Sequence, residues 1–245
     1  MDKNVKKKGL FFRFIVRTIK LFYKGSEFID IEKLPTEPCV VVGNHSQIHG
    51  PFLSEGYIPF KKLTWCDGPM MDKKEFPEYA HNNFWGGKPN GFQRFLAKLI
   101  APLVAYVFKN ADALPVYRDV RVMKTYKASV DALNDGINLV IFAESPEPHN
   151  EIINELNEYF VDVARFFYKK TGKGLLFAPM YYAPTIKKVI FGNPIRFDGE
   201  DSIENQRKVI CKYLMDEITR IAKELPVHTV IPFNVGNKKE YKKSK

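Results

Sequence analysis

One short stretch combines a strand of core character with residues that can do acid–base chemistry. The run Val40–Val42 delivers Asn44 and His45 into a loop, and Gly50 and Pro51 then begin a predicted helix. Proline is favoured at the first helical position and glycine is tolerated as a cap. An imidazole at the end of a core strand is suited to general-base catalysis, because its pKa lies near neutrality. His45 is therefore the candidate base, and the plainer alternative is a histidine that only satisfies its own backbone.

Three further polar residues fall at the ends of predicted strands: Asp67, Arg118 and Glu144. In open α/β sheets, ligands bind where the strands end. Together with His45 these make four polar residues at strand ends. One shared site is the better interpretation, because convergent polar groups at one sheet edge are typical of active sites.

The elements that must position these residues alternate between strands and helices. Strands are expected at about 39–42, 63–66, 113–118, 138–142, 174–181 and 187–191, and helices at about 51–57, 92–108, 120–135, 151–171 and 202–224. Residues 69–91 are expected to be irregular. This alternation predicts an α/β fold with a mixed, largely parallel central sheet flanked by helices.

The chain has 245 residues and a net charge of +10, enough for one α/β domain that favours an anionic partner. Residues 1–25 are expected to form a basic amphipathic helix at a membrane interface, with packing on its own domain as the alternative. Residues 26–236 would form the α/β domain and 237–245 a basic disordered tail. The three cysteines show no zinc spacing and are expected to be reduced thiols.

The apolar run 92–108 has two interpretations. It is interrupted by Gln93, Arg94 and Lys98 and contains Pro102, so it is judged too short and too broken to span a bilayer. A helix buried in the core is favoured over an element that dips into lipid.

Four blocks in order resemble the glycerolipid acyltransferase family, which includes the 1-acylglycerol-3-phosphate and glycerol-3-phosphate acyltransferases. The resemblance covers about residues 38–198. The blocks are Asn44-His45 with Pro51, Leu114-Pro115-Val116-Tyr117-Arg118, Val140-Ile141-Phe142-Ala143-Glu144-Ser145 and Leu176-Phe177-Ala178-Pro179-Met180, followed by a similar Gly192-Asn193-Pro194-Ile195 strand. Each block alone is weak, and their order is what makes the match specific.

The resemblance implies direct acyl transfer from acyl-CoA or acyl-carrier protein to a lysophospholipid or glycerol-phosphate hydroxyl. His45 would be the catalytic base and Arg118 would hold a phosphate. Asn44, Ser46, Glu144 and Ser145 would contact the substrates. No cofactor or metal is implied, the acyl donor being a co-substrate. The protein would act on the inner face of the cell membrane, bound to its anionic surface from the cytoplasm.

Two positions depart from the family pattern. Gly50 stands where the family's N-H-x₄-D block has its aspartate, and Glu147 stands where F-P-E-G-T-R has its arginine. A glycine cannot orient an imidazole or stabilise its charged form, so either Glu55, Asp67 or Glu144 takes over or catalysis is feeble or absent. Glu147 in place of the arginine removes a hydrogen-bond donor to phosphate and adds a negative charge, which suggests a different acceptor headgroup or none.

Other functions remain possible from the sequence. A non-catalytic relative that binds lipid or acyl groups would keep the fold without the chemistry. His45 and His49 could form a metal pair, although no third ligand is apparent. Nucleic-acid binding would explain the charge, but basic residues concentrate at the two ends and no recognition motif is visible, so no nucleic-acid partner is expected. The histidines His49, His81, His149 and His228 are interpreted as loop or surface residues.

Overall fold

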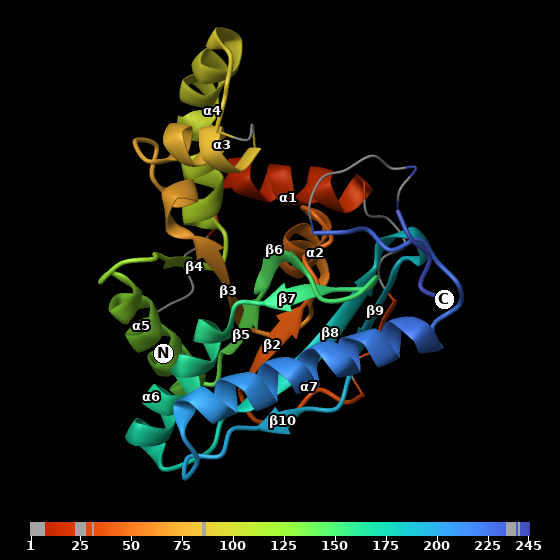
Figure 1. The fold of residues 1–245 in the computed structure, drawn as a ribbon. Helices are drawn as coiled ribbons and strands as arrows, with labels where there is room; N and C mark the ends of the chain where they lie inside the picture. Colours follow the sequence, from red (N-terminus) through yellow and green to blue (C-terminus); the bar gives the residue numbers. More distant parts are fainter. Residues whose placement is uncertain (1–7, 23–27, 31, 85–86, 234–238, 240) are drawn as a thin grey trace.

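The protein is an α/β structure built on a mixed, largely parallel eight-stranded sheet with helices on both faces (Figure 1). The computed structural model describes residues 8–22, 28–30, 32–84, 87–233, 239 and 241–245. Its strands are β1 (Phe28–Asp30), β2 (Cys39–Gly43), β3 (Lys62–Asp67), β4 (Ala113–Val116), β5 (Asn138–Ile141), β6 (Glu144–Pro148), β7 (Asn154–Leu156), β8 (Leu176–Ala183), β9 (Lys188–Phe191) and β10 (Ile195–Arg196). Its α-helices are α1 (Leu10–Phe22), α2 (His49–Tyr57), α3 (Phe76–Phe84), α4 (Gly91–Asn110), α5 (Val122–Asn134), α6 (Asp162–Thr171) and α7 (Ile203–Glu224), and its 3₁₀ turns are η1 (Gly68–Met71), η2 (Glu158–Val161) and η3 (Pro184–Ile186).

The strand order is β1-β9-β8-β2-β5-β3-β4, with β10 beside β8. From β8 through β2, β5 and β3 to β4, neighbouring strands are parallel, whereas β9 and β10 run antiparallel to β8. The predicted strands all exist. Because the strands from β8 to β4 are parallel, their carboxyl ends meet at one edge of the sheet, where ligands bind in folds of this kind.

The valine run in β2 is apolar throughout because both faces of that strand are covered. Val40 and Val42 pack with α5, α6 and α7 on one face. Val41 packs on the other face with Leu53 of α2. Figure 1 shows α7 lying across the sheet, and α2, which carries Leu53, lies on the other face. Burial on both sides fixes where β2 ends, and therefore where the loop that follows it begins.

Two predicted segments differ from the structure. The helix expected over 151–171 begins only at Asp162, because β6 and β7 form an antiparallel hairpin before it. Pro146 and Pro148 lie in this hairpin, and proline is unfavourable in a helix interior. Residues expected to be irregular over 69–91 contain η1 and α3.

The carboxyl-terminal tail also differs from the prediction of disorder. Lys243 bridges to Thr229, and Ser244 is fully buried and donates its N–H to the carbonyl of His228. His228, expected to be a loop or surface residue, lies in the loop after α7 and is 3% exposed. Over 241–245 the chain therefore packs back on the domain.

Helices α3 and α4 form a projection that stands out from the sheet, and we call these two helices the α3–α4 projection (Figure 1). A capping box at Asn90 begins α4, with its side chain and that of Gln93 each accepting the other's backbone N–H. By length and composition α4 is the one helix of the described chain apolar enough to cross a membrane. Only 17% of its most apolar window is buried, so the core assignment of 92–108 is wrong.

The three cysteines are free thiols, two buried and one half-buried: Cys39, Cys211 and Cys66. Burial raises the pKa of each thiol to about 12, because it disfavours the thiolate.

Candidate functional site

Asn44 fixes the loop that follows β2 to the neighbouring strand β8. Its side chain is 2% exposed and accepts the N–H of Tyr182 at 2.7 Å. It also donates to the carbonyl of Tyr182 at 2.9 Å and to the hydroxyl of Ser46 at 2.7 Å. Both backbone groups of Tyr182 are thus satisfied by one amide, a match that an ionised carboxylate could not make because it only accepts. Asn44 and Ser46 therefore hold the loop in this structure.

The His45 ring is held by a backbone carbonyl. Ser46 and Gln47 adopt left-handed conformations, with φ of 45° and 57°, and this turn brings the Gln47 carbonyl against Nδ1 of His45. Two such non-glycine residues store strain of about 1–3 kcal/mol each. Because a carbonyl can only accept, Nδ1 carries the proton and Nε2 keeps its lone pair. This is the tautomer that a general base needs.

Burial lowers the pKa of His45 below its usual value, and this outweighs the opposite effects of the Gln47 carbonyl and of Asp67. The rings of Phe142 and Phe233 meet the imidazole edge-on, at centroid distances of 5.7 and 5.2 Å. These apolar neighbours favour the neutral imidazole. His45 is therefore ready to accept a proton at neutral pH.

Glu144 joins the loop to the β6–β7 hairpin. Its Oε1 accepts the backbone N–H of His45 at 2.5 Å, and its Oε2 accepts the N–H of Asn154 at 2.9 Å. Burial raises the pKa of Glu144 to about 7, against the lowering effect of these two bonds. The carboxylate contacts the backbone of His45 and not its ring, so it positions the loop and does not replace the missing aspartate.

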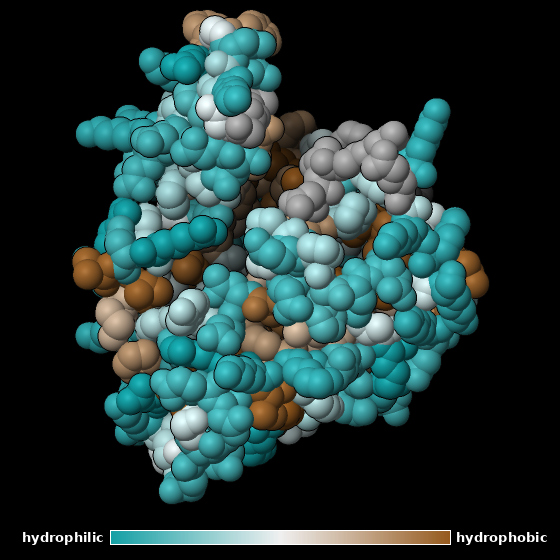
Figure 2. All heavy atoms as spheres, in the orientation of Figure 1, coloured by the Kyte–Doolittle hydropathy of each residue, from teal (hydrophilic) through white to brown (hydrophobic). Residues whose placement is uncertain are grey.

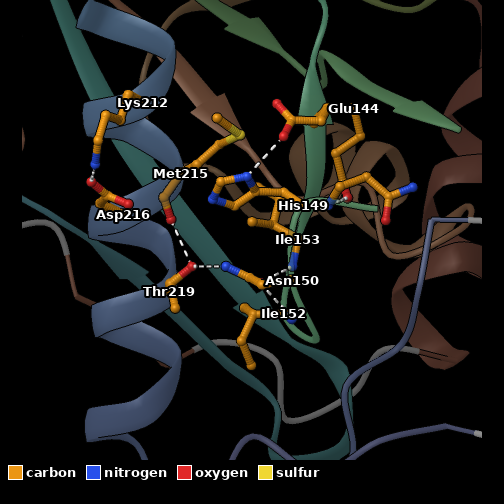
Figure 3. Close-up of polar contacts among 11 residues, drawn as sticks. Glu144, His149, Asn150, Ile152, Ile153, Lys212, Met215, Asp216 and Thr219 are labelled. Atoms are coloured by element: carbon orange, nitrogen blue, oxygen red, sulfur yellow. Dashed lines mark hydrogen bonds and ion pairs between the residues drawn. The ribbon is translucent and has the colours of Figure 1, made fainter. Parts of the chain in front are cut away.

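The hairpin that presents Asn154 is itself tied to α7. Figure 3 shows Asn150 pointing from the hairpin turn toward Thr219, to which it donates at 2.9 Å. Asn150 also accepts the N–H groups of Ile152 and Ile153, and Thr219 donates to the Met215 carbonyl at 2.7 Å. Helix α7 thereby anchors the turn of the hairpin, and the same hairpin carries Asn154, whose N–H holds Glu144.

Gly50 is required by the packing of the loop. A Cβ at this position would lie 2.8 Å from the Asn44 carbonyl oxygen, 2.9 Å from that of His45 and 2.8 Å from the Phe142 ring. Its N–H donates to the His45 carbonyl at 3.0 Å, closing the turn. The aspartate of the related motif has no room here, so glycine and the Gln47 carbonyl belong to one arrangement.

The carboxylates considered as replacements for that aspartate have other partners. Glu55 accepts from Lys8 of the α1 region at 2.5 Å. Asp67 accepts the hydroxyl of Tyr79 in α3 at 2.6 Å, and it acts on the pKa of His45 only through its charge. Nδ1 of the His45 ring contacts the backbone carbonyl of Gln47, which takes the place that a carboxylate would have in a carboxylate–histidine pair.

Arg118 and Ser145 come from other strands than the one that precedes His45. Arg118 is exposed after β4, three strands from β2, which is three spacings of about 4.8 Å, or about 14 Å. Ser145 is half-buried in β6, and its side chain bonds to Glu147 and keeps the pKa of that exposed carboxyl below its usual value. Their roles in substrate binding stay predictions.

The carboxyl-terminal segment contributes residues that the sequence did not indicate. The Tyr241 hydroxyl accepts from the Gln47 side chain at 2.7 Å, and Phe233 packs on His45. A hollow of about 260 Å³ opens here, lined by Glu144, Ile153 and Phe233 among others. No spacing rule links Gln47 with a residue 194 positions later, so no sequence signal could have found this contact.

Comparison with known proteins gives an outline of the fold only. No family model matches the chain, and no curated protein does. The crystal structure of the 1-acyl-sn-glycerophosphate (LPA) acyltransferase PlsC from Thermotoga maritima is similar, with a TM-score of 0.47 and 13% sequence identity over 86% of this chain and 81% of that one. A likeness of that size leaves the function to be argued from the site.

Groups of three or more histidine, cysteine or acidic side chains that could hold a metal are absent from the described part of the chain. The site offers a neutral imidazole with an unprotonated Nε2, an apolar environment formed by Phe142 and Phe233, and an adjoining hollow. Such an arrangement can remove a proton from a weakly acidic hydroxyl while that oxygen attacks an electrophile.

Proposed function

We propose that the protein transfers an acyl group from a thioester to the hydroxyl of a lysophospholipid or glycerol-phosphate acceptor. The observation that supports this most is the His45 ring, whose Nδ1 is held by the Gln47 carbonyl at the carboxyl edge of a parallel sheet. The order of the four sequence blocks, from Asn44-His45 to Met180, supplies the reaction class.

In this mechanism Nε2 of His45 takes the acceptor's hydroxyl proton as its oxygen attacks the thioester carbonyl. The new carbon–oxygen bond forms, the carbon–sulfur bond breaks, and the proton passes from the imidazolium to the departing thiolate. The Gln47 carbonyl and the charge of Asp67 both favour the imidazolium that forms transiently. Arg118 would hold an anionic headgroup, and the donor would be acyl-CoA or acyl-carrier protein.

The test is acyl transfer by purified protein from labelled acyl-CoA or acyl-carrier protein to a panel of lysolipids and glycerol 3-phosphate. We expect ester product with the unmodified protein and a loss of at least about a hundredfold in His45→Ala, the range of general-base catalysis. His149→Ala, which removes a histidine paired with Glu155 outside the site, is the matched control and keeps its activity. Substrate binding without turnover, equal in both variants, would instead establish a lipid-binding protein without catalysis.

A second variant tests how the ring is positioned. Tyr241→Phe removes the hydroxyl that holds the Gln47 side chain, and one such hydrogen bond contributes about 1 kcal/mol. We expect kcat to fall about fivefold with KM unchanged, because the ring loses alignment and not substrate contact. Tyr213→Phe removes a comparable hydrogen bond to the Asn193 carbonyl and is the control. An equal decrease in both variants would assign the effect to stability.

A further inference from the structure

Helix α4 has two apolar faces, and only one of them is covered. The covered face carries Ala97 and Ala101, which pack against Phe76 and Ala80 of α3. The opposite face repeats large apolar side chains at intervals of three and four residues, which aligns them along one side of the helix. These are Phe92, Phe95, Leu99 and Leu103, exposed by 71, 63, 63 and 48%.

This stripe differs from the scattered apolar residues that any protein surface shows. Figure 2 shows tan to brown, hydrophobic atoms at the tip of the α3–α4 projection, above a mostly hydrophilic surface. Phe84, the last residue of α3, is also 55% exposed. Contiguous exposed apolar surface of this kind marks a contact with a partner or a membrane.

Along α4 itself the charge has one sign. Between Glu78 and Asp112 the sequence contains no acidic residue. The basic residues of the same segment are all exposed, and they are Lys88, Arg94, Lys98 and Lys109. An apolar stripe flanked by basic side chains complements an anionic lipid surface, where the cations meet headgroups and the rings meet acyl chains.

The stripe is continuous with a second exposed apolar surface on α1. The rings of Phe11 and Tyr106 meet at a centroid distance of 5.6 Å, which joins α1 to α4. Leu10 and Phe14 are exposed on α1 by 82 and 64%, and Arg13 is exposed between them. Two helices at an angle therefore present apolar and basic residues together, as Figure 1 shows for their axes.

We propose that the α3–α4 projection docks on the anionic leaflet of a membrane, with the exposed stripe of α4 at the boundary between headgroups and acyl chains. The helix lies along the surface and does not cross it. Its alanine face is occupied by α3, and its carboxyl end leads at once into β4 at Ala113, so that end belongs to the domain. Lys98 and Arg94 can extend to the headgroups from this position.

Docking there brings the candidate active site to the lipid. Asp67 ends β3 at the carboxyl edge of the sheet, and η1 and α3 follow it directly. The hydroxyl of Tyr79 in α3 bonds to Asp67, so the projection is tied to the edge that carries His45. This inference rests on the proposed function, because an enzyme that acylates a lysophospholipid would take that acceptor from the membrane surface.

The experiment is flotation of the full chain with vesicles of phosphatidylcholine, with and without phosphatidylglycerol. We expect binding to the anionic vesicles that weakens with added salt. The double variant Phe95→Gln with Leu99→Gln should bind about tenfold more weakly, since two apolar side chains no longer enter the lipid. Val209→Gln with Val227→Gln, on and after α7, is the matched control, because those valines are also exposed, and it should bind as the unmodified protein does.

Three results separate this inference from its rivals. The proposal is overturned if the α4 variant binds vesicles as well as the control does. A second double variant, Phe11→Gln with Phe14→Gln, tests α1, and a loss of binding confined to it assigns binding to α1 instead. A change from dimer to monomer in the α4 variant, with vesicle binding retained, makes a second copy of the chain the occupant and also overturns it. His45→Ala should still float with vesicles, and the α4 variant should still turn over a short-chain soluble acceptor, so that failure of the reaction and failure of docking are distinguished.

Discussion

Gly50→Asp, the change that restores the aspartate of the N-H-x₄-D pattern, is expected to destabilise the protein by about 3 kcal/mol or more and to abolish activity. The new Cβ would lie within 2.9 Å of two carbonyl oxygens and a phenyl ring, and overpacking of this kind costs about 1–3 kcal/mol. A carboxylate placed against the carbonyls of Asn44 and His45 adds electrostatic repulsion in a buried position. The loop would have to open, and the Gln47 carbonyl would leave the His45 ring.

Urea unfolding and the transfer assay measure the two effects. Gly50→Ala carries the same Cβ without the charge and should account for the steric part of the loss. Gly91→Asp is the matched control for stability, because a Cβ there meets nothing within 4 Å and an acidic residue is favourable in the first turn of a helix. If Gly50→Asp were as stable as the unmodified protein and more active, the loop would accommodate the aspartate. Gly50 would then mean only that the group that orients His45 has been lost.

Glu144 is expected to make stability decrease as the pH rises from about 4.5 to about 7. In the folded protein the pKa of its carboxyl is about 7, against an ordinary value of 4.5, so the folded state holds the proton where the unfolded state has released it. Stability decreases with pH wherever the folded state binds more protons, and the shift corresponds to about 3 kcal/mol across this window. The contribution is fully present below pH 4.5 and lost above pH 7.

Glu144→Gln isolates this contribution from the other titrating groups. The variant cannot ionise at this position, so the difference in unfolding free energy between it and the unmodified protein should change by about 3 kcal/mol between pH 4.5 and 7. Its amide satisfies one of the two N–H groups of His45 and Asn154, which lowers stability at acidic pH. Glu204→Gln, exposed on α7, should keep the unmodified pH dependence. A difference that stays constant with pH would mean that Glu144 titrates at its ordinary pKa.

The sheet was predictable because its strands are apolar over lengths that strands favour and are bounded by glycine, proline and polar residues. The valines of β2 and the position of His45 after it followed from that pattern, and the structure confirms the sheet and its mixed, largely parallel character. The residues at the carboxyl edge could be predicted in the same way, because they come directly after the apolar runs that form the strands. What they contact was not, because contacts such as Asn44 with Tyr182 join residues 138 positions apart.

Three features depended on tertiary packing that periodicity does not report. The apolar run of α4 looked like a core helix, since the sequence cannot show that α3 covers only its alanine face. Pro146 and Pro148 marked the β6–β7 hairpin, but the helical pattern after Asp162 was extended back across them. Gly50 was interpreted as the loss of an orienting group, whereas the turn at Ser46 and Gln47 provides a carbonyl in its place.

The buried cysteines make the chain a convenient host for spectroscopic probes. Thiol reagents attack the thiolate, and a pKa of about 12 leaves very little of it on Cys39, Cys66 or Cys211 at neutral pH. A thiol introduced by Phe95→Cys would therefore react ahead of the native three without their removal. A polarity-sensitive fluorophore at that one position would record how deeply α4 enters a bilayer, in the otherwise unaltered protein.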